Sequence, residues 1–192
     1  IARMYRLHSN RDRPHHLSPW PLERLVRAAT VEPVHASMSG EHNAASEHSI
    51  NAVLPEYFQL FTRFFENAVA PVTAPIPDDP IARANNLKAS AYFLDATIAG
   101  VCALEPAESA ACGGHRFALV FVVEFGREPA LGEPGDAWIR GTNVARTDLR
   151  VAELSAVMSG YIRWLGFAAH GHAPGATQID LEQLAIRAGV AR

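Results

Sequence analysis

The sequence predicts an α/β chain of the layered α+β type, in which a small mixed sheet packs with helices after an extended N-terminal arm. Three observations support this class. Helix-like and strand-like apolar patterns alternate along residues 45–192, as they do in layered domains. Residues 1–44 are rich in Arg and His and lack sustained periodicity. Apolar residues make up 48% of the chain and charged residues 19%, which suffices for a sizeable core. The predicted division is an arm over residues 1–44 and an α/β domain over residues 45–192.

Two amphipathic helices are predicted before the first strand. In "INAVLPEYFQLFTRFFENAVA", aromatic and aliphatic residues recur every three or four positions, and Pro55 fits best in a first turn. We therefore expect this helix to begin near Leu54. After a proline-rich connector, Asp79 offers an N-cap and Pro80 a first helical residue for "IARANNLKASAYFLDA".

Two strands are predicted from apolar runs. "TIAGVCALEP" is short, apolar and closed by Pro106, and a Gly-rich break follows it. "FALVFVVEFG" is a near-continuous run rich in Val and Phe, which is typical of a strand covered on both faces.

The C-terminal part is predicted to contain a long helix, a third strand and a last helix. The longest periodic segment runs from Asn143 to Leu165, and Gly166 stands where a helix commonly ends in glycine. "FAAHGH", residues 167–172, is predicted to be a short strand. In "DLEQLAIRAGVAR", Asp180 is a suitable N-cap and Gly189 a suitable terminator.

Composition excludes some partners. The formal net charge is −3 and no run of basic residues occurs, so nothing favours nucleic acid or an anionic membrane. No apolar run approaches the ~20 residues of a membrane span, and no signal peptide is visible. We therefore expect a cytoplasmic protein, although the chain starts at Ile1 and a targeting segment can lie outside it.

The sequence contains no self-contained active site. Cys102 and Cys112 form no CxxC pair; we expect free thiols, and two cysteines alone cannot hold an iron–sulfur cluster. Cys112 and His115 are close in sequence, but no orienting carboxylate is nearby. No catalytic residue and no metal ligand is assigned.

His170 and His172 are the candidates for contact with a cofactor. If residues 167–172 form a strand, the two side chains point to the same side because Gly171 separates them. Two histidines can chelate a metal, but the pattern supplies no third ligand. The alternative is a structural joint or a pocket rim.

Five segments in order resemble the cobalamin-dependent reductive dehalogenases, which are similar in turn to the epoxyqueuosine reductases. They are "RDRPHHLSPWPLERL", "NNLKASAYFLDATIAGVCALEP", "HRFALVFVVEFG", "AELSAVMSGYIRWLGFAAHGH" and "IDLEQLAIRAGVAR". The residues that carry the resemblance are Tyr161, Ile162, Arg163, Leu165, Gly166, Phe167 and Ala169, then Leu184, Ala185, Arg187, Ala188 and Gly189.

The resemblance implies an oxidoreductase that removes halide from organohalides. It implies a base-off cobalamin, two 4Fe–4S clusters on cysteine-rich motifs, and a tyrosine proton donor beside a basic residue. The cysteine motifs are absent here, so the cofactors are expected from sequence outside this chain, and the tyrosine and basic residue cannot be assigned.

Two functions are therefore expected as alternatives. In the first, the chain is the N-terminal part of a longer dehalogenase that acts on a halogenated organic substrate and packs against the rest of the enzyme or a partner subunit. In the second, it is a vestigial, non-catalytic structural or binding module related to a cobalamin domain.

Overall fold

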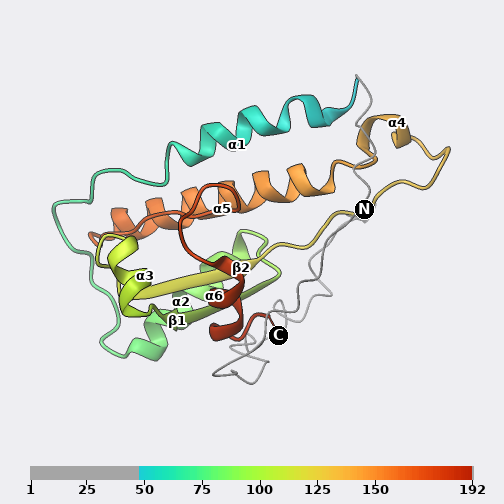
Figure 1. Ribbon diagram of the computed structural model, residues 1–192. Helices are drawn as coiled ribbons and strands as arrows, with labels where there is room; N and C mark the ends of the chain where they lie inside the picture. The colour runs from blue at the N-terminus through green and yellow to red at the C-terminus, as the bar shows by residue number, and fades with distance from the viewer. Residues whose placement is uncertain (1–47, 192) are drawn as a thin grey trace, which may run out of the picture.

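The computed structural model describes residues 48–191, so the arm predicted over residues 1–44 lies outside the described residues. Helices enclose a small sheet, and the predicted α/β class is confirmed (Figure 1). The elements are a 3-10 helix η3 (Ile50–Ala52), α1 (Leu54–Thr62), α2 (Pro80–Phe93), β1 (Ile98–Ala103), α3 (Pro106–Ala111), β2 (Phe117–Val122), α4 (Asp136–Ile139), α5 (Asn143–Trp164) and α6 (Leu181–Arg187).

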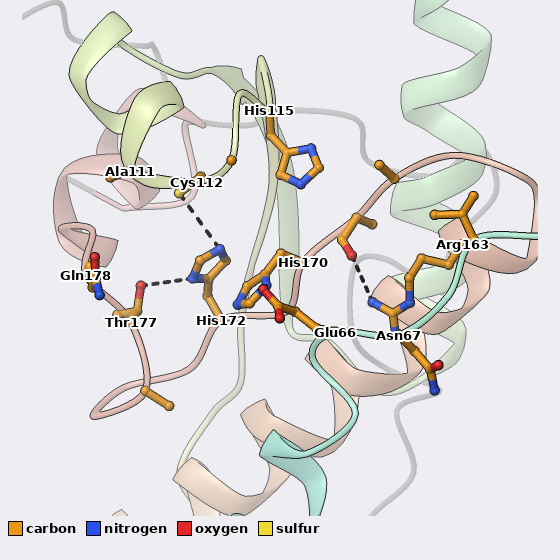
Figure 2. Close-up of a pocket in the computed structure, with 15 residues that line it drawn as sticks. Glu66, Asn67, Ala111, Cys112, His115, Arg163, His170, His172, Thr177 and Gln178 are labelled. Atoms are coloured by element: carbon orange, nitrogen blue, oxygen red, sulfur yellow. Dashed lines mark hydrogen bonds and ion pairs between the residues drawn. The ribbon is translucent and has the colours of Figure 1, made fainter.

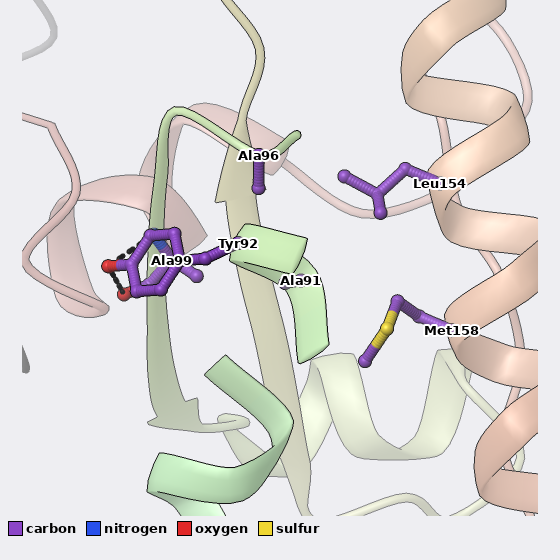
Figure 3. Packing of buried hydrophobic residues seen from close by; sticks show 6 residues of the cluster. All are labelled: Ala91, Tyr92, Ala96, Ala99, Leu154 and Met158. Carbon is purple, nitrogen blue, oxygen red and sulfur yellow. Dashed lines mark hydrogen bonds between the residues drawn. The ribbon is translucent and has the colours of Figure 1, made fainter. Parts of the chain in front are cut away.

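The sheet of the described residues consists of two antiparallel strands. β1 pairs with β2 in a register that runs from Ile98 opposite Val122 to Ala103 opposite Phe117. α2 and α5 pack on one face, where Leu119 and Phe121 reach the cluster shown in Figure 3. α6 packs on the other face. The strand expected from the continuous apolar run at residues 117–126 therefore forms over its first part, Phe117–Val122, and packs against helices on both faces, as predicted.

Each face of β2 belongs to a separate apolar cluster, because successive side chains of a strand point to opposite sides. The cluster on the α2 and α5 face contains Ala91, Tyr92, Ala96, Ala99, Leu154 and Met158. The cluster on the α6 face contains Cys102, Leu184, Ala188 and Val190, with Ala118, Val120 and Val122 packed against it. The sheet is thus the middle layer of the molecule.

The outer edge of β1 is closed by a side chain of α2. The hydroxyl of Tyr92 accepts a hydrogen bond from the Ala99 N–H at 3.2 Å and donates one to the Ala99 carbonyl at 3.3 Å (Figure 3). Tyr92 is 3% exposed, so these two backbone groups have little access to water. A single buried hydroxyl therefore replaces a third strand at this position.

Replacing Tyr92 by Phe is expected to lower the free energy of unfolding by about 1–2 kcal/mol, because two buried backbone groups lose their partner while the ring stays packed. Chemical denaturation measures the change. Tyr161→Phe is the matched control: Tyr161 is 41% exposed, and its change should stay within about 0.5 kcal/mol. Equal effects of the two variants would contradict the assignment.

A further layer forms where α1 lies along α5, on the side away from the sheet (Figure 1). Phe65, just beyond α1, packs into small side chains, Ala152 and Ala156 of α5 and Ala173 of the following loop. Small residues let the two helices approach closely, and the aromatic ring fills the space between them. The aromatic pattern predicted for this helix therefore contributes to the core.

The predicted helix ends are confirmed where side chains make caps. Asp79 accepts hydrogen bonds from the N–H groups of Ile81 and Ala82 at the start of α2. Asp180 does the same for Glu182 and Gln183 at the start of α6. Pro80 occupies the first turn of α2, as expected.

The prediction of a third strand over residues 167–172 is wrong. This segment has no strand pairing, because other groups bind its backbone. The Gly171 N–H donates to the Phe65 carbonyl at 3.0 Å, and the His172 N–H donates to the Ser155 hydroxyl at 2.8 Å. The Ala169 carbonyl accepts from Arg163 at 2.8 Å. The segment therefore follows α5 and the end of α1 rather than the sheet.

Helix α3 lies where the sequence suggested only a Gly-rich break. Glu105 and Glu108 form a capping box around Pro106, which is a signal that the sequence does contain. Within residues 48–191, no helix is both long and apolar enough to cross a membrane.

Candidate functional site: the histidine pocket

A polar pocket of about 780 Å³ lies between α3, the chain that follows α1, and the segment that follows α5 (Figure 2). We call it the histidine pocket. Its lining includes His115, His170 and His172, with Cys112 on one side and Arg163 on the other. The volume is in the range of pockets that bind small molecules. Residues that are far apart in the sequence therefore share one cavity.

His172 is held by both of its ring nitrogens. Nδ1 lies 3.0 Å from the hydroxyl of Thr177, and Nε2 lies 3.9 Å from Sγ of Cys112 (Figure 2). Burial, together with His170 and His115, lowers the pKa of His172 to about 4. The imidazole is therefore neutral at physiological pH.

Cys112 does not form an activated nucleophile with His172. Burial and the nearby carboxylate of Glu108 raise the pKa of the Cys112 thiol. An activated cysteine needs a lowered pKa and a protonated or basic partner. Here the thiol and the imidazole are both neutral, so the row of Thr177, His172 and Cys112 is a hydrogen-bonded wall of the pocket.

His170 lies beside His172, with ring centroids 4.6 Å apart. Its Nδ1 is 2.7 Å from a carboxylate oxygen of Glu66, and its ring meets Phe65 edge-on at 6.4 Å. Because the Glu66 side chain is 79% exposed, this contact is largely solvated and contributes little stability. The structure gives no hydrogen-bond partner for Nε2 of His170 among residues 48–191.

Arg163 holds the two walls of the pocket together. Its guanidinium donates to the carbonyls of Phe64 at 2.7 Å, Phe65 at 2.8 Å and Ala169 at 2.8 Å. Arg163 is 5% exposed, and burial lowers its pKa while Glu66 raises it. One side chain at the end of α5 thus fixes both the segment after α1 and the segment that carries the histidines.

His170 and His172 lie side by side in this pocket, although they do not belong to a strand. Their contact with a cofactor stays a prediction. The sequence analysis missed the contributions of Cys112, Thr177, Glu66 and Arg163 to this pocket. Cys112 lies 60 residues from His172 in the chain, so no local pattern connects the two. The proximity of Cys112 to His115 in sequence was the only available signal.

The described residues do not fit an iron–sulfur cluster. Cys102 and Cys112 are both free, as predicted, and both are buried. Cys102 lies in the cluster on the α6 face, where its thiol reaches the Leu184 carbonyl at 3.8 Å, while Cys112 faces His172. Within residues 48–191, no three His, Cys, Asp or Glu side chains form a group that could hold a metal ion.

The half-buried state of His172 is expected to make the fold less stable in mild acid. Unfolded His172 binds a proton near its ordinary pKa of 6.5, and folded His172 only near 4, so the unfolded state binds more protons between these values. The free energy of unfolding is therefore unaffected by protonation of His172 above pH 6.5 and decreases as the pH drops toward 4. Allowing for partial solvation, the loss is about 2 kcal/mol.

Denaturation curves of wild type and His172→Gln between pH 7 and pH 4 measure this loss. The variant should lack most of the extra acid sensitivity, and His170→Gln, which changes the more exposed histidine, should keep it. A wild type and a His172→Gln protein with the same pH dependence would contradict the expectation.

Comparison with known proteins finds solved structures that are similar to this chain. No protein-family model and no curated protein matches the chain. A solved structure described as the catabolic reductive dehalogenase NpRdhA matches 95% of the chain at 52% identity, with a TM-score of 0.80. The chain's homologues are reductive dehalogenases. A second reductive dehalogenase structure, described as suggesting a mechanism for B12-dependent dehalogenation, matches 95% of the chain at 55% identity, with a TM-score of 0.78.

The chain spans only about a quarter of these reductive dehalogenases, covering 26% of each. An NpRdhA structure in complex with 3-bromo-4-hydroxybenzoic acid matches at 52% identity and a TM-score of 0.80; the match covers 95% of this chain and 27% of that one. The similarity to reductive dehalogenases therefore extends over nearly the whole chain, but over a minor part of each homologue.

Proposed function

We propose that this chain forms the N-terminal part of a cobalamin-dependent reductive dehalogenase, an oxidoreductase that removes halide from organohalides. The observation that carries this proposal is the identity of 52–55% over 95% of the chain to solved reductive dehalogenases. At this identity the fold is retained.

Cobalamin and the 4Fe–4S clusters are supplied, in this proposal, by sequence outside the chain. The two cysteines of the described residues are buried in different places, which does not fit a cluster ligated by four cysteines. Cobalamin, when bound, supplies the redox chemistry of carbon–halogen reduction. This chain's own residues then form one part of the enzyme and contribute the histidine pocket to it.

Within the pocket, we infer that His170 is the residue that contacts the remaining protein or its ligand. Both ring nitrogens of His172 face neighbours, whereas His170 uses only Nδ1, for Glu66. His172 then acts as a neutral support for His170. The predicted cofactor contact of the two histidines is thus narrowed to His170.

The test uses the full-length protein that contains this chain, purified without oxygen. We expect a corrinoid absorption band in the visible region and electron paramagnetic resonance signals of iron–sulfur clusters. With an added chemical reductant as the source of two electrons, and a proton from water, we expect 3-bromo-4-hydroxybenzoic acid, the compound bound in a homologue, to release bromide and gain hydrogen in its place. A full-length protein that takes up neither corrinoid nor iron would overturn the proposal. In that protein His170→Gln should change the corrinoid spectrum or the KM, and His172→Gln should change them less.

The alternative function is a non-catalytic structural or binding module. The observation in its favour is that the polar groups of the pocket are largely satisfied by each other, as Arg163 is by three carbonyls. It predicts that the isolated chain binds no cobalamin in a titration that separates bound from free corrinoid. Tight binding in that titration would count against it.

The partners follow from the first proposal. The substrate is a halogenated aromatic compound, and the chain packs against the remainder of the dehalogenase or a partner subunit. We propose no nucleic-acid partner, because the net charge is −3 without a basic stripe. A cytoplasmic location is retained as a proposal, to be tested by fractionation of the native cells.

A further inference from the structure

Strand β2 has an outer edge that pairs with no strand of residues 48–191. The Leu104 N–H donates to the Arg116 carbonyl at 2.9 Å, which marks these opposite residues as a hydrogen-bonded pair. Because such pairs alternate along an antiparallel ladder, Ala118, Val120 and Val122 also bond to β1. The N–H and carbonyl groups of the residues between them, Phe117, Leu119 and Phe121, therefore point away from β1.

The two edges of the sheet are treated differently by the fold. On the outer edge of β1, Tyr92 binds both backbone groups of Ala99. No comparable contact covers the backbone at Phe117, Leu119 or Phe121 in the described part of the chain. An unpaired edge of this kind is a template for another strand.

An apolar groove of about 690 Å³ follows this unpaired edge. All of residues 117–123 line it. Val151 and Met158 of α5 form one wall, and Leu181 and Leu184 of α6 form the other. Since α5 and α6 cover opposite faces of the sheet, a space that touches both helices and the whole of β2 runs along the edge of β2, between the two helices. The groove thus offers backbone partners at its base and apolar side walls.

We propose that this groove receives an extended apolar segment from the remainder of the longer polypeptide, which adds to β2 as the third strand of the sheet. This inference rests on the proposed function, because it requires the polypeptide to continue as the homologous dehalogenases do. Main-chain hydrogen bonds to Phe117, Leu119 and Phe121 would provide the pairing, and alternate side chains of the added strand would face α5 and α6.

The length of the homologous dehalogenases favours the remainder of the same polypeptide as the occupant of the groove. The chain covers 26–27% of the homologous dehalogenases, so about three quarters of such a polypeptide lies outside it. A covalently linked segment binds at a high effective concentration, so a groove of this size can be filled without a strong intrinsic affinity.

A second copy of this chain does not fit the groove. Its own free edge is also recessed between α5 and α6, so the helices of two copies would meet before the two strands could pair. An extended segment without helices on both of its faces can enter.

Amide hydrogen exchange of the full-length protein, resolved to single residues by fragmentation mass spectrometry, tests the pairing. The amides of Phe117, Leu119 and Phe121 should exchange at least about 100-fold more slowly than unprotected amides. Ala118, Val120 and Val122, which bond to β1, are matched controls in the same strand and should be protected in any case. Rapid exchange confined to the three edge amides would overturn the inference.

Photo-cross-linking identifies the occupant. A benzophenone amino acid substituted for Phe117, which is 64% exposed at one end of the edge, should cross-link to a segment outside the 192 residues. Cross-links to residues 1–47, or between isotopically distinct copies, would overturn the assignment of the occupant.

Corrinoid absorption and bromide release are measured on the same sample. Active, corrinoid-bound protein with unprotected edge amides contradicts this inference alone. Protected edge amides in a longer protein without corrinoid contradict the proposed function alone.

Discussion

Replacing Arg163 by Ala is expected to lower the free energy of unfolding by about 3–5 kcal/mol. The guanidinium donates to three backbone carbonyls, those of Phe64, Phe65 and Ala169, and it is 5% exposed. Truncation leaves these acceptors in a space that water reaches poorly. The loss also releases the segment that carries His170 and His172, so the histidine pocket should open along with the destabilisation.

Two variants separate this geometry from charge alone. Arg163→Lys keeps the charge but cannot span three carbonyls with one planar group, so it should lose at least half as much stability as Arg163→Ala. Arg150→Ala removes a partly exposed arginine whose partners are Glu153 and Asp95, and it should cost less than about 1 kcal/mol. Denaturant unfolding measures all three. A fully stable Arg163→Lys protein would show that charge, rather than the three-carbonyl geometry, matters.

Gly166→Ala is expected to lower the free energy of unfolding by about 3 kcal/mol. Gly166 follows α5 with φ at +87°, in the region that favours glycine. A Cβ atom there would also lie 2.7 Å from Thr73 Cα and 2.8 Å from the Val72 carbonyl oxygen. Both obstacles are backbone atoms, so no side-chain rotation relieves them. The connector between α1 and α2 would have to move away from α5.

Gly175→Ala is the matched control, because it shares the backbone conformation without the contact. Its φ is +73°, and no other atom lies within 4 Å of the position where a Cβ atom would stand. It should cost about 1 kcal/mol, the strain of the conformation alone. The difference between the two variants in thermal or denaturant unfolding isolates the close approach of residues 72 and 73 to α5. Equal losses would show that this approach is easily relaxed.

The elements that the sequence predicted correctly are those marked by local signals. Asp79 with Pro80, and Asp180 before α6, are side chains that satisfy N–H groups two or three residues away, so their effect can be read from adjacent letters. The apolar run at β2 was also sufficient to predict a strand, because a strand covered on both faces needs apolar residues at consecutive positions. α3 was missed although Glu105 and Glu108 provide a similarly local signal.

The segment at residues 167–172 shows where local pattern is insufficient. Its alternation suits a strand, but a strand forms only when a partner offers its backbone. Here Phe65, Ser155 and Arg163 bind the segment's backbone groups first. These partners lie on other elements, and none could be inferred from the spacing within the segment.

By itself, the sequence determined the class of fold, most helix boundaries and the family resemblance, because caps, breakers and apolar periodicity act over a few residues. Only the tertiary structure decided that burial beside His170 and His115 keeps His172 neutral, and that Cys112 and Thr177 contact its ring nitrogens. Only the tertiary structure decided, too, that Arg163 joins the two walls of the pocket and that β2 has an edge unpaired within residues 48–191. Those features depend on contacts between residues far apart in the chain, whose pairing is fixed by packing rather than by neighbouring letters.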